Sequence, residues 1–227
     1  MSAFTVFLIL LFRFCSSSDD LWKQFFPNDN LPSNSIQNKN NPNIDTTASN
    51  YFIDFCGFKS YTKTVINIKQ DNSIKFLISN SIFQKNYNSN SESNAANINI
   101  LSNARYVEYR TVALNCTTQH TCHHVKLKYK DGSTFIENCT IREGVYCKLG
   151  NDITIGSCVY NNEANNLEIS YINMTDVLAR DVVAYYLKTP KNPVIAKYSL
   201  YCLIKTQMTK IIGFDANLNM SYCNIFN

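Results

Sequence analysis

Five residues whose side chains could do chemistry lie within nine positions of one another. They are Cys116, His120, Cys122, His123 and His124, and these include all three histidines of the chain. Structural zinc sites usually pair cysteines two to four residues apart, whereas five residues separate these two. Adjacent side chains on a strand point to opposite faces, so His123 and His124 cannot share one metal. We therefore expect no metal site, and we expect one of these two rings to face the core.

Catalytic motifs are absent from the rest of the sequence. A cysteine nucleophile needs a free thiolate beside an imidazole, and we expect no unpaired cysteine. The serine elbow Gly-x-Ser-x-Gly does not occur, and neither do phosphate loops or dinucleotide fingerprints in a chain with only six glycines. A glycosidase-type pair of carboxylates remains open, which leaves an exported hydrolase as an alternative. We predict a non-enzymatic protein without a cofactor.

The amino-terminal residues 1–18 resemble a secretory signal peptide. An apolar run extends from Ala3 to Phe12, and small residues follow it where a peptidase could cut. The alternative is a short amphipathic helix of a cytosolic protein. Export predicts a secreted chain without a membrane anchor, because no later apolar run is long enough to span a bilayer.

Removal of Cys15 with the signal peptide would leave an even number of cysteines. Eight cysteines in an exported chain predict a framework of up to four disulfides, but they allow 105 pairings. Four N-glycosylation sequons agree with export, at Asn115, Asn138, Asn173 and Asn219.

The charge of the chain argues against a nucleic-acid partner. The net charge of +4 comes from 21 basic and 17 acidic residues, and these are scattered without a basic stripe. Asparagine is abundant, which is typical of an AT-rich genome and says little about function.

Polar segments divide the chain into a tether and a folded part. Residues 19–50 are mostly polar and are predicted to form a tether, with one short helix over Asp19–Phe26. The folded part is predicted over residues 51–227, with a long surface loop at Asn86–Asn99. We find no internal repeat.

The folded part is predicted to be all-β. Its segments are short, rich in Val, Ile, Tyr, Phe and Thr, and often alternate between apolar and polar residues. In 124–139, Val125, Leu127 and Tyr129 alternate with lysines before Asp131-Gly132, a dipeptide that favours a two-residue hairpin turn. About ten such segments indicate an antiparallel β-sandwich or barrel.

The cysteine-containing half of the chain resembles the amino-terminal, galectin-like domains of alphacoronavirus spike proteins. The matching features are a strand ending in "ALNC", the loop "CTTQHTC", the segment "VKLKYKDGSTFIENC", Cys147, "YINMTDVLARDVV", "YSLYC" and a final "FDANLNMSYC". The resemblance covers a little over half the chain and rests on cysteine spacing and β pattern.

This resemblance implies a disulfide-bonded, galectin-like antiparallel β-sandwich. It implies a Cys116–Cys122 bridge and a Cys202–Cys223 bridge, and it leaves Cys56, Cys139, Cys147 and Cys158 for two further bridges of unassigned pairing. It also implies a free-standing, secreted viral accessory glycoprotein of coronavirus origin that binds a host-surface glycan, a receptor or a soluble host factor. A secreted immune decoy that binds a cytokine or chemokine is the alternative.

Exposed tyrosines are the candidates for contact with a sugar, because aromatic faces stack on sugar rings. Six tyrosines lie on strand-like segments: Tyr106, Tyr109, Tyr185, Tyr186, Tyr198 and Tyr201. The sequence does not tell which of them face solvent. Lys126, Lys128 and Lys130 could meet an anionic glycan, although a solvated strand face explains them equally well.

Overall fold

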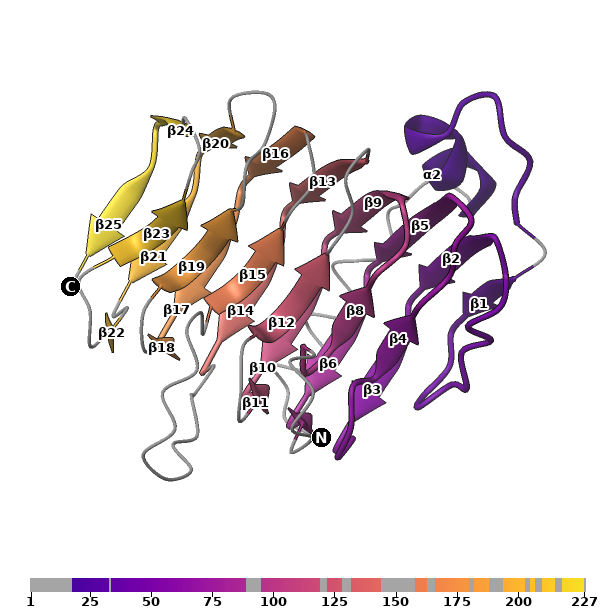
Figure 1. Ribbon diagram of the computed structural model, residues 1–227, viewed down its shortest axis with the longest axis horizontal. Coiled ribbons are helices and arrows are strands. Elements are labelled where there is room, and N and C mark those ends of the chain that lie inside the picture. Colours follow the sequence, from indigo (N-terminus) through magenta and orange to yellow (C-terminus); the bar gives the residue numbers. More distant parts are fainter. Residues whose placement is uncertain are drawn as a thin grey trace.

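The chain folds as a parallel β-solenoid (Figure 1). The computed structural model describes residues 18–32, 34–88, 95–118, 122–127, 132–143, 158–162, 166–179, 182–187, 194–202, 205–206, 210–214 and 218–226. Three main sheets enclose one apolar core, and every strand pair in these ranges is parallel. The prediction of an all-β chain is confirmed, and the prediction of an antiparallel galectin-like β-sandwich is wrong.

We name the three main sheets A, B and C. Sheet A contains β1 (Ser35–Gln37), β2 (Asn50–Asp54), β5 (Ile74–Ser79), β9 (Ala104–Tyr109), β13 (Ser133–Glu137), β16 (Asn166–Ser170), β20 (Val194–Lys197) and β24 (Leu218–Ser221). Sheet B contains β3 (Gly57–Lys59), β6 (Ile82–Gln84), β10 (Val112–Leu114), β14 (Thr140–Arg142), β17 (Asn173–Thr175), β21 (Leu200–Cys202) and β25 (Asn224–Phe226). Sheet C contains β4 (Ile66–Ile68), β8 (Ile98–Ile100), β12 (Cys122–Leu127), β15 (Cys158–Asn162), β19 (Val182–Leu187) and β23 (Lys210–Phe214). Two short pairs join β7 (Tyr87–Asn88) to β11 (Thr117–Thr118), and β18 (Leu178–Ala179) to β22 (Lys205–Thr206).

The predicted hairpin over 124–139 is wrong because its two strands belong to different sheets. β12 lies in sheet C between β8 and β15, whereas β13 lies in sheet A between β9 and β16. Alternation of apolar and polar residues identifies a strand with one buried face, but it is the same for parallel and antiparallel partners. The chain turns from one face of the solenoid to the next where a hairpin was expected.

The core is built from stacked side chains of like kind. Parallel strands in register place equivalent residues above one another about 4.8 Å apart. Tyr51, Phe76 and Tyr106 are fully buried in three successive strands of sheet A, with ring centroids 5.7 and 5.5 Å apart. Phe58 stacks on Phe83 in sheet B with centroids 4.9 Å apart. Such stacks bury apolar area in every turn.

A corner with an unusual backbone joins each sheet A strand to the next sheet B strand. Its first residue has a positive φ of about 46° to 57° in all seven cases: Phe55, Asn80, Arg110, Asn138, Tyr171, Tyr198 and Tyr222. The next residue points inward, and these residues are Cys56, Ser81, Thr111, Cys139, Ile172, Ser199 and Cys223. We call this position the first corner. It explains the Asn-Cys dipeptide at Asn138, because asparagine tolerates positive φ and a small residue fits inside.

No disulfide occurs among the cysteines that the structure describes. Cys56, Cys116, Cys139, Cys202 and Cys223 are all free. The expected disulfide framework is therefore wrong for these five residues, including the bridges that would use Cys116, Cys202 and Cys223. The side chains of Cys122, Cys147 and Cys158 lie outside the described residues. The stacked strands enclose an apolar core without bridges between these five cysteines.

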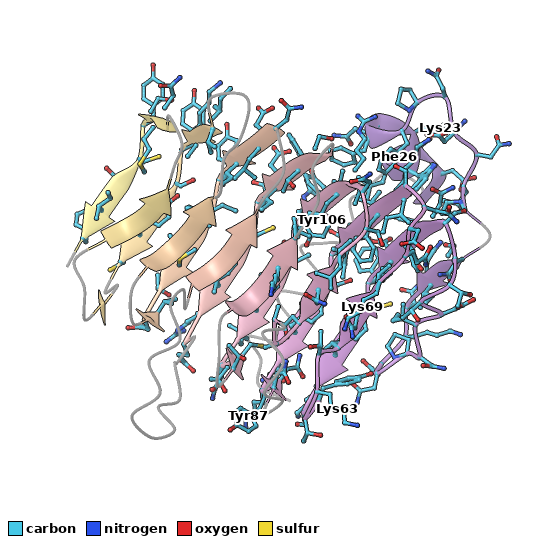
Figure 2. All side chains as sticks on the ribbon, in the orientation of Figure 1. Lys23, Phe26, Lys63, Lys69, Tyr87 and Tyr106 are labelled. Carbon is cyan, nitrogen blue, oxygen red and sulfur yellow. The ribbon has the colours of Figure 1, made fainter. Side chains whose placement is uncertain are left out.

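The segment expected to be a tether is packed against the solenoid. The predicted helix is confirmed as α2 (Ser18–Phe25), which lies on the outer face of sheet A through Leu21, Trp22 and Phe25, with Phe26 directly after it. Figure 2 places Phe26 against the strands and Lys23 further out on α2. β1 extends sheet A, and a bridge between Asn40 and Gly57 extends sheet B. Residues 35–48 therefore cover the amino-terminal end of the solenoid.

Candidate functional site

The opening cluster of cysteines and histidines does not form a site in the described residues. His124 is buried in the core on β12, as expected for one of the two adjacent histidines. Cys116 is buried at a turn after β10. His120 and the side chains of Cys122 and His123 lie outside the described residues. Among described residues, no group of three or more His, Cys, Asp or Glu side chains is placed to hold a metal ion.

His124 takes part in a buried polar network that sequence reasoning missed. Its Nε2 lies 2.7 Å from Oε1 of Glu108, and its Nδ1 lies 2.8 Å from Nδ2 of Asn97. The Asn97 amide also accepts a hydrogen bond from Asn86 at 2.9 Å. An amide N–H donates, so Nδ1 accepts and the Nε2–H donates to Glu108.

Glu108 is held as a carboxylate inside the solenoid. The hydroxyl of Tyr106 donates to its Oε2 at 2.9 Å, and the hydroxyl of Thr111 donates to its Oε1. Burial acts to raise the pKa of Glu108, but attraction to His124 and the hydrogen bonds from His124, Thr111 and Tyr106 outweigh it and lower the pKa. Glu108 and His124 are at most 1% exposed, so substrate cannot reach them. The network stabilises the core and is not an active site.

The outer face of sheet A carries a groove of about 660 Å³ beside α2. One row of residues in register runs along this face, and we call it the outer row: Phe52, Leu77, Val107, Phe135, Glu168, Ile195 and Asn219. The helix α2 covers the first three. The groove continues over the other four residues of the outer row, which α2 does not cover.

The groove combines an apolar floor with polar side chains. Phe25 of α2 contacts Phe135 with ring centroids 5.3 Å apart, and Ile195 continues the floor. The polar residues that line it are Gln24, Arg105, Ser133, Asn166, Glu168 and Asn219. The guanidinium of Arg105 lies 5.1 Å from the ring centroid of Phe26. Apolar surface with a few placed polar groups is typical of ligand sites.

Three stacked tyrosines lie on the first corner beside this face. Tyr171, Tyr198 and Tyr222 have ring centroids 5.1 and 5.0 Å apart and interplanar angles of 12° and 8°. They are 49%, 47% and 76% exposed. We call them the tyrosine ladder. Each ring covers a face of its neighbour, so the ladder presents mainly ring edges and hydroxyl groups to solvent.

Of the six tyrosines considered from the sequence, only Tyr198 is clearly exposed in the described structure. Tyr106, Tyr185 and Tyr201 are buried, and Tyr109 is half-buried. The side chain of Tyr186 lies outside the described residues, as do Lys128 and Lys130, whereas Lys126 is half-buried. Tyr171 and Tyr222 were missed. The sequence feature that marks them is their position: each tyrosine directly follows a strand and directly precedes a residue that points inward.

Two carboxyl side chains lie on neighbouring strands of sheet A, and one of them lines the groove. Glu168 lines it from β16, and Glu137 lies on β13. Burial raises the pKa of Glu137, Arg110 opposes this shift and the charge of Glu168 adds to it. A pair of neighbouring carboxyl groups is the arrangement that glycoside hydrolysis uses.

All four sequon asparagines are exposed. Asn138 occupies a first-corner position and Asn115 occupies a second corner, also with positive φ, after sheet B. Asn173 lies on β17, and Asn219 lies on β24 at the groove. Each side chain is accessible to a glycosylating enzyme, and glycosylation stays a prediction.

Residues 1–17 lie outside the described residues, so the signal peptide stays a prediction. No helix in the described part of the chain is long and apolar enough to cross a bilayer.

No family model matches the chain, and neither the curated proteins nor the solved structures contain a match to it. The resemblance to spike domains, with its viral origin, stays a prediction from sequence, although the sandwich fold that it implied is wrong.

Proposed function

We propose that this protein is a non-catalytic, exported binding protein. Its ligand is a linear glycan, which binds in an extended conformation in the groove on sheet A. The groove carries this proposal. It runs across several parallel strands, and the strand repeat of about 4.8 Å gives a long ligand an evenly spaced set of contacts. Phe135 and Ile195 give the floor apolar surface, which suits the C–H faces of sugar rings, and the polar side chains suit their hydroxyl groups.

Rigidity supports binding at this site. Every strand of the outer row except β24 pairs on both sides, and Phe135 packs against the apolar cluster of α2. A site that is already ordered loses little conformational entropy when a ligand binds. The exposed hydroxyl groups of the tyrosine ladder lie next to this face and extend the polar surface.

A glycan array followed by calorimetry with the best linear glycan tests the proposal. We expect Ile195→Glu, which places a charge on the groove floor, to abolish binding. The matched control is Leu200→Glu, a substitution of similar chemistry on the outer face of sheet B in the same turn, and it should bind as the original chain does. Because Asn219 carries a sequon at the groove, Asn219→Gln protein from secretory cells is measured in parallel. A chain that binds no glycan, or a control that fails equally, would contradict the proposal.

An exported hydrolase is the second candidate, because Glu137 and Glu168 place two carboxyl groups on neighbouring strands of sheet A. Incubation of the bound glycan with the protein distinguishes the two functions. Binding without new reducing ends supports the binding protein. Release of reducing ends that is lost in both Glu137→Gln and Glu168→Gln supports the hydrolase. Capture of a cytokine or chemokine in place of a glycan would instead support the immune decoy.

A further inference from the structure

Arg105 is a charged side chain of the groove that has no ion-pair partner among the described residues. It lies on β9, lines the groove beside α2 and is exposed. The cation next to it in register, Lys75, differs from it, because the Nζ of Lys75 lies 2.6 Å from Oδ1 of Asp29. No ion pair within the described ranges includes Arg105. Its charge is therefore available to a negative group on a ligand.

An aromatic ring positions the guanidinium of Arg105. This group lies 5.1 Å from the ring centroid of Phe26, which is fully buried directly after α2. A cation over an aromatic face is attracted to it, so the contact favours one placement of a long side chain. The edge of a guanidinium matches the two oxygen atoms of a carboxylate and can donate two parallel hydrogen bonds to them. Arg105 is thus suited to bind a carboxylate.

The helix α2 closes the groove beside Arg105. Gln24 and Phe25 line the groove from the helix. The helix also covers Val107, the outer-row residue on the same strand as Arg105. A linear ligand on the open part of the outer row therefore ends at α2. Its terminal sugar is the one that lies beside Arg105.

Glu168 gives the groove a charge of the opposite sign, two strands away from Arg105. The strands β9, β13 and β16 are consecutive in sheet A, so the first and third are about 10 Å apart across the sheet. Phe135 lies on the strand between them and is part of the groove floor. Glu168 is exposed. A carboxylate there repels a negative ligand group and accepts hydrogen bonds from hydroxyl groups.

We propose that the groove selects a linear glycan whose terminal sugar carries a carboxylate and whose following sugars are neutral. This inference rests on the proposed function, because it names the class of glycan that binds in the same groove. Arg105 donates hydrogen bonds to the terminal carboxylate, and the neutral sugars lie over Phe135 and Ile195. Their hydroxyl groups donate to Glu168. A neutral terminal sugar leaves Arg105 without a partner, and Glu168 disfavours a carboxylate further along the glycan.

Calorimetry with matched hexasaccharides tests this selection. Linear β-linked hexamers of glucose, galactose and N-acetylglucosamine are compared in three forms: neutral, with a uronic acid at the non-reducing end, and with an aldonic acid at the reducing end. We expect an acid-ended form to bind about tenfold more tightly than its neutral form, and added salt should weaken this preference. Absence of binding by every form contradicts the proposed function together with this inference. Equal binding of all three forms overturns only the inference.

Arg105→Gln tests whether this side chain causes the preference. The variant should bind the acid-ended and neutral forms equally, with the affinity for the neutral form unchanged. The matched control is Arg142→Gln, which removes the same charge from an exposed arginine on sheet B and should keep the tenfold preference. Trp22 fluorescence of the variant checks that α2 stays docked. A preference that survives Arg105→Gln, or that both variants lose equally, overturns the assignment.

Glu168→Gln tests the second half of the selection. The probe is a hexamer that carries a uronic acid on every sugar. The original chain should bind it less tightly than the acid-ended form, and Glu168→Gln should raise the affinity for it several-fold, because like charges no longer meet. Glu143→Gln, an exposed carboxylate next to sheet B, is the control and should leave this affinity unchanged. An equal effect of the two substitutions would show that net charge, rather than the groove, sets the preference.

Discussion

The thiol of a first-corner cysteine donates a hydrogen bond to the carbonyl two residues before it. Sγ of Cys139 lies 3.3 Å from the Glu137 carbonyl, and Sγ of Cys223 lies 3.4 Å from that of Ser221. Ser81 makes the same contact, with its Oγ 2.6 Å from the Ser79 carbonyl. Cysteine and serine therefore make the same hydrogen bond at this position.

This equivalence predicts how Cys139 responds to substitution. Cys139→Ser keeps the hydrogen bond and should change the free energy of unfolding by no more than about 1 kcal/mol. Cys139→Leu overfills the corner and should cost about 1–3 kcal/mol. Urea unfolding measures both, with and without reductant. A large loss in Cys139→Ser that reductant reproduces in the original chain would mean that Cys139 is disulfide-bonded after all.

The Glu108–His124 pair is the residue-scale feature with the largest expected energetic effect. His124→Leu leaves the buried carboxylate without its imidazole partner, and it should lower the free energy of unfolding by about 3–5 kcal/mol. Glu108→Gln, which removes the charge but keeps its shape, should cost less. Urea unfolding of both variants checks this order. The opposite order would show that the charge itself is stabilising.

The same pair makes stability depend on pH. The pKa of Glu108 is lowered in the folded chain from its ordinary value of 4.5, so the unfolded chain takes up a proton first as pH falls. The contribution of Glu108 is complete above pH 4.5 and is lost as the pH falls from there through the folded pKa. Over that pH range, the free energy of unfolding should therefore fall less steeply for Glu108→Gln than for the original chain.

Sequence reasoning predicted that one of two adjacent histidines faces the core, but it did not say which one and it missed the partners of His124. Adjacent residues on a strand face opposite ways, so one of His123 and His124 had to point inward. Glu108 and Asn97 lie 16 and 27 residues away, and only the register of parallel turns brings them together. The burial of several asparagines was not predicted either. Asn86, Asn88, Asn97 and Asn99 are fully buried, whereas asparagine composition predicted a surface loop there.

At the scale of elements, α2 is held by aromatic contacts rather than by its length. Eight residues are too few for a stable isolated helix. Trp22 and Phe26 are fully buried, with ring centroids 4.3 Å apart, and both pack on the outer row. Lys75 also pairs with Asp29 just beyond the helix, at 2.6 Å.

Phe26→Ala tests the docking of α2. The lost packing should cost about 3–5 kcal/mol, and it should loosen the helix from sheet A. Trp22 is the single tryptophan of the chain, so its fluorescence reports this directly, through a red shift and greater quenching by iodide. Lys23→Ala, an exposed substitution on the same helix, is the control. Unchanged emission in Phe26→Ala would show that α2 docks without this contact.

The strands could be predicted from the sequence, but their partners could not. Segments such as "SIKFLIS" and "RYVEY" became β5 and β9, since alternating or apolar β-formers identify strands in any sheet. The sheet order depends on which strands are neighbours, and alternation carries no such information. At Asp131-Gly132 a local turn preference suggested a hairpin, but the strands on either side, β12 and β13, lie in different sheets.

At the scale of the whole molecule, the repeat is present in the structure but not in the amino-acid sequence. Successive sheet A strands begin 24 to 33 residues apart, at Asn50, Ile74, Ala104, Ser133, Asn166, Val194 and Leu218. The first corner is filled by phenylalanine, asparagine, arginine or tyrosine. What recurs is a backbone conformation followed by an inward residue, and a search for repeated letters does not detect it.

Deletion of residues 19–50 tests whether this segment belongs to the fold. It would remove α2, β1 and the cover over the amino-terminal edge, and it would expose Phe52, Leu77 and Val107. We expect the shortened chain to aggregate, because these apolar side chains and the outer edge of β2 would then be free to contact other molecules. Light scattering and circular dichroism measure this. A shortened chain that remains as soluble and as stable as the original would support the tether predicted from the sequence.

The first corner accepts residues of different types, so this part of the surface can change by mutation. The corner side chains are exposed or half-buried, and a positive φ is already accepted at seven positions by four types of non-glycine residue. Substitutions there alter what the molecule displays while the residues that fold it stay in place. Mutation can therefore change the first-corner residue of one turn without changing the others. Related chains could diverge in what they recognise while they keep the same fold.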